Sequence, residues 1–164
     1  MSLVIPHPIW TTCGSNPYEV NKATVQARML SGRYVTDQLS RPWKANSRGI
    51  CTIPTCSGSD IGSLEHLLLF CPGLSDDRAR ILNLFTTVAA EAHELFFIID
   101  SFLNSDTTDT RMQFLLDCST LPEVIRLRQS TGDSLLARLF FLTRTWCYTI
   151  HRSRMTKLGL LQFR

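Results

Sequence analysis

The chain has 164 residues, of which 44% are hydrophobic and 19% are charged, a composition typical of one folded globular domain rather than a disordered tail. No apolar stretch is long enough to span a bilayer and no hydrophobic leader follows a basic start, so we expect a soluble intracellular protein, nuclear or cytoplasmic. The net charge of +3 hides a segregation, because both ends are basic and the middle is acidic. The basic flanks are either phosphate-binding surfaces or cations that pair with the acidic middle.

The N-terminal part predicts a lead-in segment followed by a helix. Two prolines and a glycine without sustained periodicity indicate an extended lead-in over residues 1–16. A helix is predicted from Pro17, because Asn16 is a good N-cap and Glu19 stands where a capping-box carboxylate would. Apolar residues then recur at helical spacing as far as Tyr34.

The next segment holds four residues with the donor atoms and the spacing of a zinc site. In the pattern C-x4-C-x9-H-x4-C these are Cys51, Cys56, His66 and Cys71. Tetrahedral zinc takes four Cys or His ligands, and two short-spaced pairs close such a site at little cost in chain entropy. A short helix over residues 64–70 would hold the histidine and end just before the last cysteine. The alternative is that buried free cysteines and an ordinary helical histidine fall at these positions by accident.

The remainder of the chain predicts a helical extension. We expect one helix over residues 75–99, two shorter ones over 110–118 and 122–129, and a last helix from residue 133 with a broad apolar face. The predicted fold class is mostly α, a helical module with one small irregular zinc-knuckle loop. Its predicted divisions are an extended lead-in over 1–16, a helix plus knuckle over 17–75, and a helical extension over 76–164.

A family resemblance is carried by the stretch VNKATVQARMLSGRYVTDQLSRPWKANSRGICTIPTCSGSDIGSLEHLLLFCPGL. It resembles the region after the polymerase core in reverse transcriptases of non-LTR (LINE-like) retrotransposons. Such proteins carry an ARMLSGRY-like helix, a tryptophan, an N-x-x-G-x-C approach and a CCHC knuckle ending in EHLLL-x-CP. The resemblance covers about a third of the chain. It implies that Cys51, Cys56, His66 and Cys71 hold a structural Zn²⁺, and that this region grips RNA or DNA during target-primed reverse transcription.

The catalytic parts of that family have no counterpart here. The chain has no F/Y-A-D-D-like segment, no set of carboxylates for two-metal nucleotidyl transfer, and no carboxylate-and-lysine nuclease cluster. We therefore expect no enzyme, but the accessory tail of a non-LTR retrotransposon protein or a stand-alone fragment of one.

Basic and aromatic residues interleave before the predicted knuckle. The candidate nucleic-acid-binding residues are Arg28, Arg33, Tyr34, Arg41, Trp43, Lys44 and Arg48. Cations suit phosphates and aromatic rings stack on single-stranded bases, although a solvated helix face with both rings in the core is an equal alternative. A second basic set on the last helix is expected to be a solvated face rather than a site; it comprises Arg144, His151, Arg152, Arg154 and Lys157.

Two other functions fit the same sequence. In a zinc-stabilised protein-interaction module, the apolar helices over residues 81–99 and 135–150 would bury a partner protein. The chain would alternatively be an inert relic of a retroelement. RNA or DNA is the expected partner, a protein partner stays open, and no membrane is expected.

Overall fold

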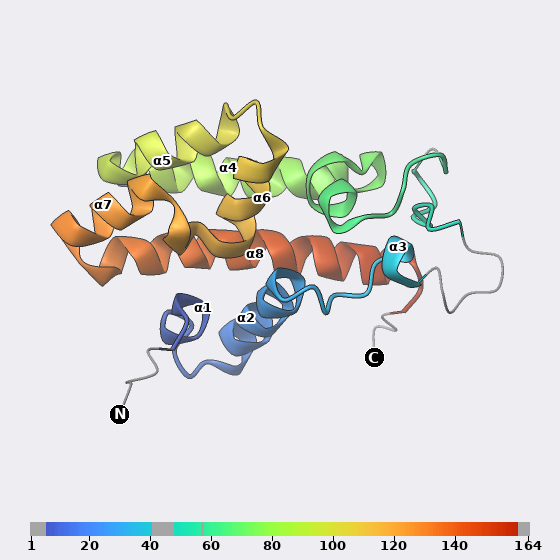
Figure 1. Ribbon diagram of the computed structural model, residues 1–164, viewed down its shortest axis with the longest axis horizontal. Helices are drawn as coiled ribbons and strands as arrows, with labels where there is room; N and C mark the ends of the chain where they lie inside the picture. The colour runs from blue at the N-terminus through green and yellow to red at the C-terminus, as the bar shows by residue number, and fades with distance from the viewer. Residues whose placement is uncertain (1–5, 41–47, 57, 161–164) are drawn as a thin grey trace.

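The computed structural model describes residues 6–40, 48–56 and 58–160, and Figure 1 shows their arrangement. The protein is mostly helical, as predicted. Within these ranges there is no strand, and the β-type pairing is an isolated antiparallel bridge between Ile50 and Ile61. No helix in the described ranges has both the length and the apolar character needed to cross a membrane.

The first helices begin where local capping directs them. α2 (Pro17–Leu30) starts as predicted, with the Asn16 side chain accepting a hydrogen bond from the Tyr18 amide at 2.9 Å. Glu19 does not close a capping box in the structure. Its carboxylate instead lies 2.7 Å from the Lys22 ammonium and 3.5 Å from the Arg144 guanidinium.

The sequence predicts an extended lead-in over residues 1–16. Within its described part, the structure instead contains α1 (Pro8–Thr11), a single helical turn. Proline pre-sets the backbone at the first helical position, and His7 Nδ1 accepts from the Ile9 amide. Ile9 is only 1% exposed. A turn of four residues is too short to show periodicity, and its burial against the rest of the chain stabilises it.

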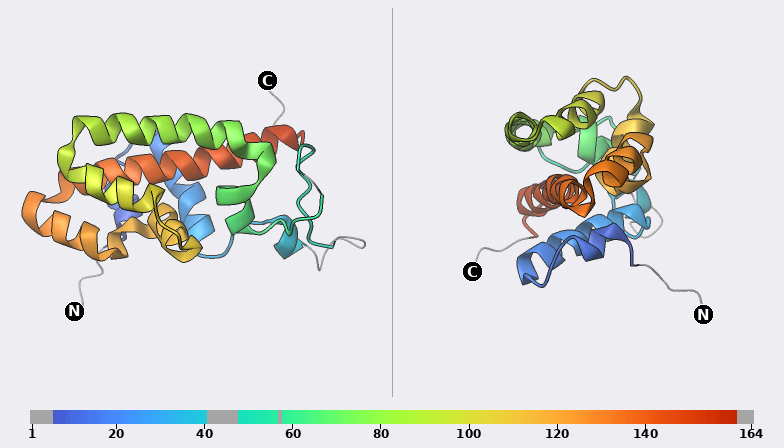
Figure 2. Two further views of the ribbon diagram at one scale, coloured as in Figure 1. Left: turned by 90° about the horizontal axis from the view of Figure 1, so that it is seen from above. Right: turned by 90° about the vertical axis from the view of Figure 1, so that its left-hand side faces the viewer.

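The helix expected over residues 75–99 is two helices, α4 (Ser75–Glu91) and α5 (His93–Leu103). Ala92 between them has an extended backbone, with φ −137° and ψ 93°. This break lets α5 turn back along α4 (Figure 2), so that the Phe85 and Phe102 rings lie 5.8 Å apart between centroids. The structure therefore has two helices joined by aromatic packing, where periodicity alone favours one continuous helix.

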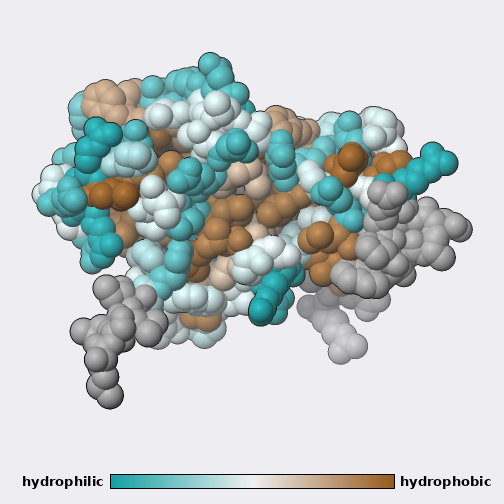
Figure 3. All heavy atoms as spheres, viewed as in Figure 1, coloured by the Kyte–Doolittle hydropathy of each residue, from teal (hydrophilic) through white to brown (hydrophobic). Residues whose placement is uncertain are grey.

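The C-terminal helices agree closely with the sequence expectation. They are α6 (Thr108–Asp117), the 3₁₀ turn η4 (Cys118–Thr120), α7 (Pro122–Thr131) and α8 (Asp133–Lys157). α8 is central, because α2, α4, α6 and α7 all pack against it. On the face shown in Figure 3, apolar residues gather over α6 and α8 in the middle of the molecule.

One hydrophobic core extends across the predicted boundary at residues 75/76. It contains Met29 of α2, Leu68 of the cysteine-rich segment, Phe85 of α4 and Leu139 of α8. The indole N–H of Trp146 also donates to the Leu68 carbonyl at 3.2 Å. In the described chain, the boundary therefore does not separate two cores.

Two arginines of α8 that we expected on a solvated face are buried. Arg144 is 2% exposed and donates to the hydroxyl of Thr12 at 2.7 Å and to its carbonyl at 3.2 Å. Arg154 is 8% exposed and donates to the Val35 carbonyl at 2.9 Å. Buried guanidinium groups persist because these hydrogen bonds compensate for lost hydration. These two arginines therefore hold the N-terminal third of the chain against α8.

Candidate metal centre

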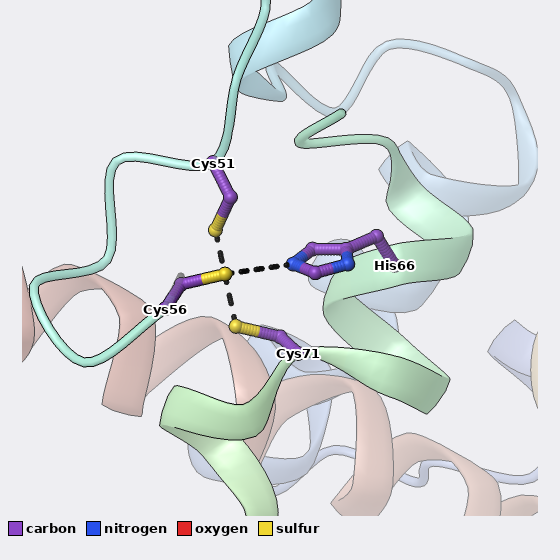
Figure 4. A group of neighbouring side chains, drawn as sticks. All are labelled: Cys51, Cys56, His66 and Cys71. Atoms are coloured by element: carbon purple, nitrogen blue, oxygen red, sulfur yellow. Dashed lines mark hydrogen bonds between the residues drawn. The ribbon is translucent and has the colours of Figure 1, made fainter. Parts of the chain in front are cut away.

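Four side chains from one irregular segment point toward a common centre at one end of the molecule (Figures 1 and 4). They are those of Cys51, Cys56, His66 and Cys71, and their ligand atoms all lie within 4.8 Å of one another. The structure thus brings together the four residues that the spacing predicted, and this cluster could hold a metal ion.

The distances within the cluster fit a tetrahedral site. The sulfurs of Cys51 and Cys71 are 3.8 Å apart, and Cys56 Sγ is 3.5 Å from His66 Nε2. Bonds of about 2.3 Å to sulfur and 2.0–2.1 Å to nitrogen give tetrahedral edges of about 3.8 Å and 3.6 Å respectively. A disulfide would need about 2.05 Å between sulfurs, and all six cysteines are free. The donor set and its geometry therefore fit a metal rather than a covalent crosslink.

A π-helical turn presents two of the four residues. In η2 (His66–Phe70) the Cys71 amide donates to the His66 carbonyl at 2.6 Å, which closes a turn over five residues. Ser63 caps the segment, because its hydroxyl accepts from the His66 amide at 3.0 Å. In an α-helix, residues five apart differ by about 140° around the axis. The wider π turn instead returns His66 and Cys71 to one side, and π turns are frequent at functional sites.

The other two cysteines lie on a loop that approaches this turn closely. The Cys51 amide donates to the Asp60 carbonyl at 2.9 Å, and the Cys56 amide donates to the Ile53 carbonyl at 2.9 Å. Gly73 allows the contact with the turn, because a Cβ there would lie 2.5 Å from Thr55 Oγ1 and 2.6 Å from Ile53 Cγ2. A larger residue at position 73 would therefore displace Thr55 and Ile53 of the loop that carries Cys51 and Cys56.

Burial keeps three of the four ligand groups uncharged in the absence of a metal. It raises the pKa of Cys51 to about 12 and raises the pKa of Cys71, and it lowers the pKa of His66. Near neutral pH these thiols therefore carry protons, which a metal ion must displace to bind thiolates. The imidazole is already in the neutral form that coordinates metals.

A buried ion pair anchors the loop to the helices. Asp37, in the one-turn helix α3 (Asp37–Ser40), accepts from the Thr52 amide at 3.2 Å and from the Thr52 hydroxyl at 3.0 Å. The Arg154 guanidinium lies 3.4 Å from the same carboxylate. These residues are far apart in the sequence, so no local pattern could have placed them beside Cys51.

Comparisons with known proteins do not extend this picture. The chain matches no family model, no curated protein and no solved structure. Its function must therefore be argued from its own donor atoms, geometry and charge.

The candidate nucleic-acid-binding residues are only partly placed. Arg28, Arg33 and Arg48 are exposed. Tyr34 is 7% exposed and its hydroxyl lies 3.1 Å from His151 Nδ1, so its ring is not available to stack on a base in this conformation. The other three candidates lie outside the described residues: Arg41, Trp43 and Lys44.

Proposed function

We propose that this protein is a non-catalytic, zinc-stabilised helical module that binds RNA or DNA. The observation that supports the zinc assignment is the convergence of three cysteine sulfurs and one imidazole nitrogen within 4.8 Å. Thiolate and imidazole ligands favour Zn²⁺, whereas Mg²⁺ and Ca²⁺ prefer oxygen. Four protein ligands fill a tetrahedral sphere and leave no position for a catalytic water, so the ion would be structural.

The nucleic-acid part of the proposal depends on the family resemblance and on exposed cations. It assigns to the module the role of the accessory tail of a non-LTR retrotransposon protein, or of a stand-alone fragment of one. A phosphate-gripping protein should lose affinity steeply as salt rises, because its binding releases counterions from the nucleic acid. Changing Arg33 and Lys44 to Ala should weaken binding while leaving the helical content intact.

Native mass spectrometry tests the metal assignment directly. We expect one zinc per chain in the wild type and none in Cys56→Ser or His66→Ala. Cys13→Ser is the matched control, because this buried cysteine lies outside the cluster and its thiol donates to the Trp10 carbonyl at 3.1 Å, which a hydroxyl can also do. A folded wild-type chain without metal would overturn the zinc assignment.

A protein-binding surface is the second candidate, and one observation favours it. The helix faces that we expected to meet a partner point inward, since Phe85 and Leu139 are fully buried. On α5, however, Phe96 and Phe97 stay 46% and 65% exposed, in contact with each other and with the His93 ring. An apolar interface there would show weak salt dependence, which distinguishes it from a phosphate-binding surface.

A further inference from the structure

The fold divides the basic residues of the described chain into two classes. Most donate to a carboxylate or a carbonyl: Lys22, Arg78, Arg80, Arg111, Arg126, Arg128, Arg138, Arg144 and Arg154. Five exposed side chains have no ion pair or hydrogen bond in the ranges that the structure describes: Arg28, Arg33, Arg48, Arg152 and Lys157. Unpaired cations repel one another, so a surface that gathers them is suited to an anionic partner.

Two of these cations belong to opposite ends of the sequence but lie on helices that pack against each other. Arg28 is in the last turn of α2 and Arg152 is near the end of α8, and the two helices pack together. The end of α8 lies beside the metal loop, which comprises residues 48–56 and 58–74 (Figures 1 and 2). Tyr34 and His151 join the two segments through their 3.1 Å contact. Burial is the largest cause of the lowered His151 pKa, and the charges of Arg154, Arg28 and Arg152 lower it further.

A hollow between α8 and the start of α4 extends this surface. Every residue that lines it is polar: Asp77, Arg80, Arg152, Ser153, Thr156 and Lys157. The carboxylate of Asp77 is already paired with Arg80, so Arg152 and Lys157 are left for an external anion. A protein interface would offer an apolar centre, whereas guanidinium, ammonium and hydroxyl groups are the donors that phosphate oxygens accept from.

We propose that Arg28, Arg152 and Lys157 form one α8 basic surface that binds the phosphate backbone of a nucleic acid beside the metal loop. Ser153 and Thr156 donate their hydroxyls to phosphate oxygens in the hollow. The assignment rests on the proposed nucleic-acid function and deepens it by naming the surface. Contact is through the backbone and independent of sequence, because Tyr34 is buried and these groups reach phosphates rather than bases.

The test measures fluorescence anisotropy of a labelled single-stranded RNA, and of a DNA of the same sequence, over a range of salt concentrations. The variant Arg152→Ala/Lys157→Ala should bind both at least about tenfold more weakly at low salt. Its log–log salt slope should shrink by about 1.4, since each phosphate contact to a single strand contributes about 0.7.

Arg126→Ala/Arg138→Ala is the matched control. It removes the same charge from exposed positions on α7 and at the opposite end of α8, and it should bind within about twofold of the wild type. Circular dichroism and zinc content should be unchanged in both variants, so that a loss of binding is not a loss of folding.

The outcomes separate the surface from the function it rests on. If the wild type binds nucleic acid and the α8 variant binds equally well, the surface is wrong while nucleic-acid binding stands. If the wild type binds neither strand, both proposals fail. A loss of affinity confined to RNA or to DNA would overturn the proposal of backbone contact. Binding of polyglutamate as tight as that of RNA would mean that the surface attracts any polyanion without selecting nucleic acid.

Discussion

The guanidinium of Arg78 lies against the backbone of a metal-ligand residue. Its Nη2 donates to the Cys71 carbonyl at 2.6 Å, and its Nη1 is buried without a hydrogen-bond partner. Burial lowers the pKa of Arg78, while a thiolate at Cys71 raises it. Three thiolates and a neutral imidazole around a divalent ion carry a single negative charge. Arg78 is therefore placed to compensate that charge as well as to orient Cys71.

Replacing Arg78 should weaken metal binding without removing a ligand. We expect Arg78→Met to lower zinc affinity about 10- to 100-fold, the range seen when groups that orient metal ligands are lost. Arg78→Lys should lose less zinc affinity, because lysine keeps the positive charge. Competition with a chromogenic chelator measures the affinity, and Arg80→Met is the control at an exposed neighbour. Equal affinities for wild type and Arg78→Met would show that the guanidinium only packs.

His151 should make the protein less stable in mild acid. Burial and three arginines hold its pKa below the ordinary value of 6.5. As pH falls through 6.5 the unfolded imidazole takes up a proton before the folded one, which lowers the free energy of the unfolded state, so the stability of the folded state falls. Melting temperatures between pH 7.5 and 5.5 should therefore drop more for the wild type than for His151→Gln. His66 shifts in the same direction but is present in both proteins, and parallel curves would exclude His151 as the cause.

At the residue scale, the sequence predicted what local spacing encodes. The four candidate ligands follow one another within a short segment, so their convergence could be predicted from turn residues and donor types. Asp37 and Arg78 could not be predicted, because their roles arise from contacts made only after the chain has folded back. The same holds for Tyr34, whose burial depends on α8.

The aromatic cluster between α4, α5, α6 and α8 holds these elements together. Phe85 contacts Phe102, Phe114 and Trp146, with ring centroids 5.7 to 6.0 Å apart. Such rings stabilise a core through buried area and favourable edge-to-face or tilted packing. The break at Ala92 allows α5 to bring Phe102 into this cluster.

Phe85→Ala should therefore destabilise the fold strongly. Truncating a fully buried phenylalanine costs roughly 3–5 kcal/mol, because the neighbouring rings only partly close the cavity. Phe97→Ala, at a mostly exposed position on α5, should stay within about 0.5 kcal/mol of the wild type. Urea denaturation followed by circular dichroism compares the two. A similar loss in both variants would mean that α5 is held by contacts other than this cluster.

Helix starts were more predictable than helix breaks. Asn16 and Pro17 define the start of α2 through local chemistry, and Pro122 does the same for α7. The break at Ala92 has no glycine or proline to mark it. At this break α5 turns back to pack against α4, and helical periodicity carries no information about such contacts between separate helices.

The metal loop is joined to the helical core by buried apolar residues such as Leu68 and by polar contacts. Asp37 contacts Thr52, Trp146 donates to the Leu68 carbonyl, and Arg78 donates to Cys71. The aromatic cluster is formed by helices outside the metal loop. The whole molecule therefore has one core, with one end whose local order we expect to depend on the ion.

Metal removal should consequently open that end and leave most helices intact. With a strong chelator we expect faster hydrogen exchange over residues 48–56 and 58–74, a lower melting temperature, and a nearly unchanged helical signal in circular dichroism. Cys56→Ser without chelator should show the same pattern. Global loss of the helical signal would mean that the ion is required for the entire core.

The π turn at His66–Phe70 constrains how the chain can change in length. Deleting or adding one residue in this wide turn would rotate position 71 away from position 66, so that the Cys71 sulfur would no longer face the imidazole. Between Cys56 and Ser63, the described residues 58–62 contain no helix and carry no such constraint. Among descendants of this sequence, insertions should therefore accumulate before the histidine, while the interval from His66 to Cys71 should stay at four residues.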